Sequence, residues 1–256
     1  MKTLFITLAS VFLCLSSVYA ADMSMLELEK AGFDHPIRRE LKLSTQVQQN
    51  SIYTHRLDLS ALAFSKDSSW SLENMMTELS GVQKVFNGCG ILIGKIDLIQ
   101  AESYKLYTNS IEFTFRKGER SVNLSEISTA LKQINTFRLT PTIYFVKNAY
   151  YFLNSAMVYS QGASQPEYWV GSAPESGAVL IPELISSDEY RNQRNSDYST
   201  IAHELGHILL NDPRNNSHTS IQGNVMADSA AGGGGRWEPW QCERILKSPY
   251  IHKLKN

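Results

Sequence analysis

Apolar and polar residues recur along this chain with spacings that predict both strands and helices. Short apolar or alternating runs predict strands at residues 52–59, 91–99, 110–116, 141–152, 168–170 and 178–181. Helical spacing predicts helices over residues 71–86, 125–137 and 238–246. Glycines at 232–235 predict a flexible loop before the last of these helices. This order of strands and helices indicates an α/β or α+β fold.

One further helix is expected to end at Asn211. Ser196 or Ser199 can cap its first turn, and a stripe of apolar residues follows one of its sides. The members of that stripe are Ile201, Leu205, Ile208 and Leu209. Asn211 tolerates the left-handed conformation that often ends a helix, and Pro213 prevents continuation. The helix can therefore pack on a core with one side while its other side faces a cleft.

The side away from the stripe carries His203 and His207, with Glu204 next to the first histidine. Histidines four residues apart project from the same side of a helix, so both imidazoles can bind one metal ion. H-E-x-x-H is the pattern of zinc helices, whose glutamate can reach a water molecule on the metal. Zn²⁺ is the expected cofactor, because neutral imidazole suits zinc and a catalytic zinc usually has three protein ligands.

His218 is the candidate for the third ligand. Three of the six histidines of the chain fall between residues 203 and 218. Residues 211–217 are polar and contain Pro213, so they are expected to form a loop. A loop of this length can return His218 to the open side of the metal.

The H-E-x-x-H pattern, a third histidine after a turn and Met226 together resemble the metzincin zinc metalloproteases. Met226 follows His218 by eight residues, which is the spacing of the matrixin branch, whose methionine lies in a tight turn beneath the zinc. The resemblance covers residues 203–226. It implies a metzincin-like zincin catalytic domain with a twisted mixed sheet, an active-site helix, a Met-turn and a C-terminal helix.

The chain departs from the long metzincin pattern, which has glycine at the position of Leu210 and histidine at that of Pro213. A helix about one turn longer, followed by five extra loop residues before His218, accommodates the difference. By analogy with other zincins, Asp212 is an alternative third ligand and Glu238 a weaker one. The tyrosine that astacins carry two residues after the methionine is absent, because Asp228 stands there.

These residues and the resemblance predict a secreted zinc metalloendopeptidase. Its three histidines would bind zinc, Glu204 would act as general base towards a zinc-activated water, and Met226 would form a floor under the ligands. A protein or peptide substrate would lie extended along an edge strand. Two alternatives stay open: a zinc-stabilised binding or effector protein that hydrolyses nothing, and a zinc amidase that acts on small or cell-wall peptides.

The composition and the N-terminal sequence indicate which partners and which cellular location to expect. The formal net charge is −1 and charges are spread along the chain, so no nucleic-acid partner is expected. Residues 1–20 read as a signal peptide, with a basic start, an apolar run and a cleavage-like Val18-Tyr19-Ala20. That run is too short to cross a membrane. The mature chain is expected to be exported, to the periplasm or the medium, without a membrane span.

After the signal peptide, residues 21–50 are expected to form a leader or short pro-segment and residues 51–256 one catalytic domain. Cys89 and Cys242 are the two cysteines that survive processing. In an exported protein such an isolated pair is expected to form a disulfide. Zinc ligation is the alternative, although neither cysteine has a C-x-x-C companion.

Overall fold

The computed structural model describes most of the chain after the expected signal peptide. The described residues are 25–41, 43, 53–65, 70–104, 110–112, 122–133, 140–153, 156–159, 161–173, 176–193, 196–228 and 232–254. The predicted signal peptide, and parts of the elements predicted at 110–116 and 125–137, lie outside these ranges. Within them, no helix combines the length and the apolar character that crossing a membrane requires.

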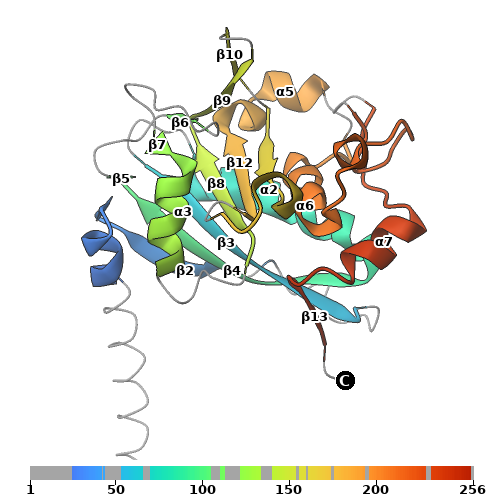
Figure 1. The fold of residues 1–256 in the computed structure, drawn as a ribbon, viewed down its shortest axis with the longest axis horizontal. Helices are drawn as coiled ribbons and strands as arrows, with labels where there is room; N and C mark the ends of the chain where they lie inside the picture. Colours follow the sequence, from blue (N-terminus) through green and yellow to red (C-terminus); the bar gives the residue numbers. More distant parts are fainter. Residues whose placement is uncertain are drawn as a thin grey trace, which may run out of the picture.

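A seven-stranded mixed sheet forms the centre of the fold (Figure 1). Its four parallel strands are, in order, β12 (Ala178–Pro182), β8 (Thr142–Val146), β3 (His55–Phe64) and β4 (Ile91–Ala101). Its edges are antiparallel strands, β11 (Ala163–Gln165) beside β12 and β2 (Ile37–Leu41) beside β4. β13 (Ile251–Lys253) pairs antiparallel with the start of β3. The mixed sheet and its helices agree with the predicted α/β or α+β class.

Each face of the sheet supports a separate apolar core, because side chains alternate along its strands. In β3, Ala61 and Ala63 face one core while Leu62 and Phe64 face the other. The first core lies under three helices, α2 (Leu72–Phe86), α6 (Thr200–Leu210) and α7 (Pro239–Ile245). The second lies under α3 (Leu124–Gln133) and the short helix at 25–30. The H-E-x-x-H helix, α6, therefore belongs to the first face.

Local signals place α2 where the sequence predicts it. Ser71 caps the helix, and its Oγ accepts a hydrogen bond from the backbone N–H of Asn74 at 3.1 Å. The 3₁₀ turn η2 (Asn87–Cys89) follows, and Gly90 ends it in the left-handed region with a φ of 67°. The chain then enters β4 directly, which confirms the predicted helix, break and strand.

Two predicted strands differ from the structure. Residues 168–170 belong to a helix, α4 (Glu167–Val170), because Pro166 starts it and Asn211 accepts a hydrogen bond from the N–H of Tyr168 at 3.0 Å. These contacts outweigh the strand preference of tyrosine, tryptophan and valine. The run at 141–152 forms two strands, β8 and β9 (Asn148–Leu153). β9 lies in a separate four-stranded sheet with β10 (Ala156–Tyr159), β6 (Ser110–Glu112) and β7 (Val122–Asn123).

Residues 25–41, part of the expected leader or pro-segment, are built into the fold. The helix at 25–30 is followed by β1 (Phe33–Asp34), which pairs with β5 (Ser103–Tyr104), and then by β2. Leu28 and Phe33 are buried in the second core. The segment thus completes the edge of the large sheet opposite to β11.

A disulfide ties the C-terminal helix α7 to η2, and a capping box marks its start. Cys242 forms the predicted disulfide with Cys89 of η2, across a sequence separation of 153 residues, so these cysteines are not metal ligands. At the start of α7, the backbone N–H of Glu238 donates to Gln241 Oε1 at 2.8 Å, and the Glu238 side chain accepts from the N–H of Gln241. This capping box confirms the predicted start of the helix.

Candidate metal centre

The helix that carries the H-E-x-x-H pattern begins and ends at the predicted signals. Ser199, and not Ser196, is its N-cap, with Oγ accepting from the N–H of Ala202 at 3.2 Å. Asn211 ends it in the left-handed conformation, with φ 44° and ψ 48°. The connection from β12 to this helix runs through η4 (Glu183–Ser186) and α5 (Asp188–Gln193).

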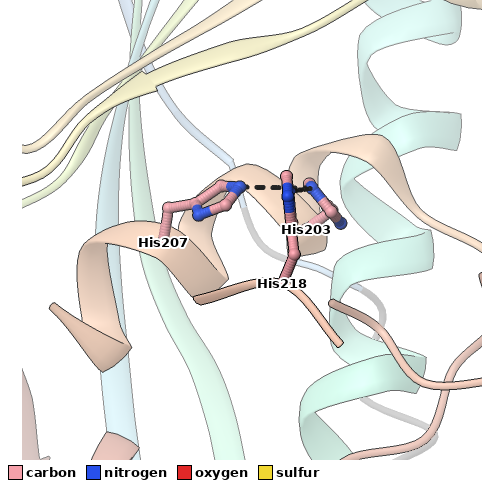
Figure 2. A group of neighbouring side chains, drawn as sticks. All are labelled: His203, His207 and His218. Carbon is pink, nitrogen blue, oxygen red and sulfur yellow. Dashed lines mark hydrogen bonds between the residues drawn. The ribbon is translucent and has the colours of Figure 1, made fainter. Parts of the chain in front are cut away.

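Three histidines converge beside α6 (Figure 2). His203 and His207 come from successive turns of α6, and His218 follows the 3₁₀ turn η5 (Arg214–Ser217). Nε2 of His203 lies 3.2 Å from Nε2 of His207 and 3.2 Å from Nε2 of His218. One ligand nitrogen from each histidine lies within 4.8 Å of the other two. The structure therefore brings together all three predicted metal ligands.

The spacing of these nitrogens fits a single shared metal ion. Nitrogens bound to a tetrahedral zinc at about 2.0–2.1 Å lie about 3.3 Å from one another. Nδ1 of His203 donates its proton to the carbonyl oxygen of Val225 at 2.8 Å, so Nε2 of the neutral ring presents a lone pair. Lone pairs aimed at one point repel each other unless a cation lies between them. A set of three imidazoles suits zinc and other transition metals.

Burial favours the neutral, metal-binding form of the histidines. Desolvation lowers the pKa of His203 to about 4, although the hydrogen bond to Val225 opposes the shift. Desolvation also lowers the pKa of His218, and the charge of Asp228 opposes that shift. Metal binding requires neutral imidazole. Both rings are therefore already neutral at pH 7 and can bind a metal without first releasing a proton.

The carboxylate of Asp228 lies beside Nδ1 of the third histidine, His218. Its Oδ1 lies 3.5 Å from Nδ1 of His218, on the side of the ring away from the other histidines. A carboxylate near the second nitrogen of a ligating histidine orients the ring and favours one tautomer. The position two residues after Met226 thus holds a group that serves the ligand His218.

Met226 packs against the backbone of α6 between the two helical ligands. A Cβ atom at Gly206 would overlap the Sδ atom of Met226, so the methionine occupies the space that the glycine leaves. The backbone N–H of Thr219 donates to the carbonyl oxygen of Met226 at 2.8 Å, which holds this turn beside His218. The turn around Met226 therefore contacts both the helix and the loop that carry the ligands.

A buried pair of amides attaches this turn to α7. Asn224 Nδ2 donates to Gln241 Oε1 at 2.8 Å, and Gln241 Nε2 donates to Asn224 Oδ1 at 3.3 Å. The same Asn224 Oδ1 accepts from the N–H of Met226 at 2.8 Å. The sequence analysis missed both amides. The signal for Gln241 was its place three residues after Glu238, where a capping box has its second member.

Glu204 faces the edge strand β11. A hydrogen bond joins its carboxyl group to the Ser164 side chain, and a Cβ atom at Gly162 would lie 2.8 Å from Glu204 Oε1. Burial raises the pKa of Glu204 to about 7, against the opposing effect of Ser164. A carboxyl group with this pKa can accept and release a proton at neutral pH. The sequence does not predict Gly162 or Ser164, because a three-residue strand leaves no readable alternation.

The two alternative ligands take part in other interactions. Asp212 accepts a hydrogen bond from Arg214 Nε at 3.0 Å, and its Oδ2 lies 3.2 Å from Nη1 of Arg244. Arg244 also donates to the carbonyl oxygen of Asn211 at 3.1 Å. Glu238 caps α7. Among the described residues, the group that could hold a metal contains neither carboxylate, because each is committed to an arginine or a helix terminus.

No protein-family model matches this chain. A search of curated proteins finds no match either. The case for the site therefore rests on the residues and on their geometry.

Replacing Gly206 by alanine is expected to weaken metal binding and to destabilise the protein. The new methyl group would displace Met226 from beneath the ligands, and overpacking of this kind costs about 1–3 kcal/mol. Gly81→Ala is the matched control, because a Cβ there would meet Ser199 at an ordinary 3.7 Å. The control should gain up to about 1 kcal/mol from helix propensity. Denaturant unfolding with and without zinc measures the stability and the zinc binding of both variants. Equal effects of Gly206→Ala and Gly81→Ala would contradict the packing role of Gly206.

Asp212 is expected to stabilise the protein near neutral pH and less so in acid. Arg214 holds the pKa of Asp212 at about 2, below the ordinary 3.8. A depressed folded-state pKa adds stability above the ordinary value, here about 2 kcal/mol, and that stability is lost as the pH falls towards 2. Asp212→Asn should therefore unfold more easily at pH 7. Its deficit in unfolding free energy should shrink to about half at pH 3. A pH-independent deficit would contradict the assigned pKa.

Proposed function

We propose that this protein is an exported, zinc-dependent endopeptidase. The observation that carries the proposal is the placement of Glu204. One helix directs His203 and His207 towards His218 and presents the neighbouring carboxyl group to the edge strand of the sheet. Among the strands that the structure describes, β11 pairs only with β12, so its other edge has no strand partner there and an extended peptide could pair with it.

Each residue has a role that its contacts support. A metal ion held by the three histidines would supply a Lewis acid and would acidify a water molecule. Glu204 would accept the proton of that water and pass it to the leaving amine. The hydrogen bond from Ser164 would hold the carboxylate in place during both transfers. Backbone groups of β11 would bind the substrate backbone and align the scissile bond with Glu204.

The test compares the unaltered mature chain with Glu204→Gln for zinc content and for cleavage of casein. We expect one zinc ion per chain in both proteins, because Glu204 is not a ligand. Cleavage should fall by about 100-fold to 10,000-fold in the variant, since it lacks the general base. Removal of zinc with a chelator should stop cleavage in the unaltered chain, and added zinc should restore it. Absence of zinc from both proteins would refute the proposal.

The two alternatives make different predictions in the same experiment. A non-catalytic zinc protein would hold one zinc in both variants and cleave nothing, but that reading leaves the burial of Glu204 beside an open strand edge without a purpose. A zinc amidase would act on short free-ended peptides and spare denatured protein. Assays with casein and with short peptides, run in parallel, separate these outcomes from an endopeptidase.

A further inference from the structure

α4 presents two aromatic side chains at the end of the edge strand. Trp169 is 63% exposed, which is unusual for so large an apolar ring, and Tyr168 is half-buried beside it. Their ring centroids lie 6.4 Å apart with 34° between the ring planes. We name these two side chains the aromatic platform. Tyrosine and tryptophan are the side chains that most often dominate binding energy at interfaces.

The platform is fixed to the metal-binding helix. The backbone N–H of Tyr168 donates to Asn211 Oδ1 at 3.0 Å, and Asn211 Nδ2 donates to Glu167 Oε2 at 3.4 Å. Asn211 is the C-cap of α6, four residues after His207. The backbone that carries the two aromatic residues is therefore held in a defined position relative to α6 before any peptide binds. A surface ordered in advance loses less entropy on binding.

The platform lies within a few peptide residues of Glu204. Ser164 contacts Glu204, and α4 begins three residues later at Glu167. Trp169, the more distant member of the platform, follows Ser164 by five residues, which span at most about 17 Å. The charges of Asp212 and Glu204 add to burial in raising the pKa of Tyr168, which places its hydroxyl in the field of both carboxylates. An extended peptide along β11 would thus pass the platform within about five residues of the bond next to Glu204.

We infer that the aromatic platform selects substrates that carry an apolar or aromatic side chain within about five residues of the cleaved bond. This inference rests on the proposed function. Ring-on-ring contact would bind such a side chain.

The first test maps cleavage sites in denatured casein by mass spectrometry. The unaltered chain should favour phenylalanine, tyrosine or leucine at one position within about five residues of the cut. Trp169→Ala should lose that preference, and kcat/KM for a phenylalanine peptide relative to its alanine counterpart should fall about tenfold. Trp240→Ala is the matched control, because Trp240 is also exposed (46%) but lies on α7. It should keep the preference.

A second measurement does not depend on activity. Fluorescence polarisation gives the affinity of labelled phenylalanine, alanine and glutamate peptides for zinc-loaded Glu204→Gln. The phenylalanine peptide should bind about tenfold more tightly than the others, and adding Trp169→Ala should remove the difference. Peptide selection without any cleavage would support the platform while refuting the endopeptidase. The inference would be overturned if Trp169→Ala left the preference in cleavage or binding intact. It would also be overturned if the protein did not select between the peptides.

Discussion

Replacing His218 by alanine is expected to reduce zinc affinity by more than 100-fold. The change removes one of three nitrogens that converge within 4.8 Å, and the two left on α6 cannot complete a tetrahedral protein site. Loss of a group that only supports a ligand costs about 10-fold to 100-fold in affinity, so loss of the ligand itself should cost more. Competition with a chromophoric chelator measures the affinity, and Asp228→Asn should show the smaller loss.

Asp212→Asn is the decisive comparison for the identity of the third ligand. Asp212 lies in the same loop as His218, but its carboxylate is held by Arg214 and Arg244. We expect this variant to retain one zinc per chain at saturation, since none of its lost contacts is a metal ligand. If Asp212→Asn lost zinc while His218→Ala kept it, the aspartate would be the ligand and the assignment of His218 would be wrong.

Sequence alone could predict the H-E-x-x-H helix, α6, because its signals are local. Ser199 and Asn211 mark its two ends, and the histidines at 203 and 207 need only helical geometry to meet. His218 was predictable as well, since a polar loop with a proline can fold back over a short distance. The helix at 72–86 and the pairing of Cys89 with Cys242 follow from similarly short-range or compositional reasoning.

The surroundings of the site were not predictable because they depend on contacts between distant segments. Gly162 and Ser164 approach Glu204 from a three-residue strand, whose identity as an edge depends on the order of the sheet. The segment at 168–170 becomes a helix because Asn211, more than forty positions away, accepts its hydrogen bond. Strand preference, a local property, gave the wrong answer there.

The candidate metal centre is assembled from three segments that meet at α7. The turn at Met226 reaches α7 through the amides of Asn224 and Gln241, and the loop before His218 reaches it through Arg244. α7 in turn is tied to η2 by the disulfide. The position of the third ligand therefore depends on a helix that contributes no ligand of its own.

Replacing Cys89 and Cys242 by serine is accordingly expected to lower both stability and metal affinity. Removing a crosslink over 153 residues costs up to about 5 kcal/mol in the chain-entropy model, which corresponds to about 10–20 °C in Tm for a domain of this size. Thermal unfolding of the metal-free proteins measures the first effect, and the unaltered chain under dithiothreitol should match the variant.

The change in zinc affinity distinguishes two ways in which the disulfide can act. If it constrains only the unfolded chain, the folded variant should bind zinc as tightly as the unaltered protein. If it also holds α7 against the turn at Met226, zinc affinity should fall by about 10-fold, within the range for loss of a supporting group. The contacts of Gln241 with Asn224 favour the second outcome, because they link the helix that carries Cys242 to the turn whose Val225 carbonyl oxygen orients His203.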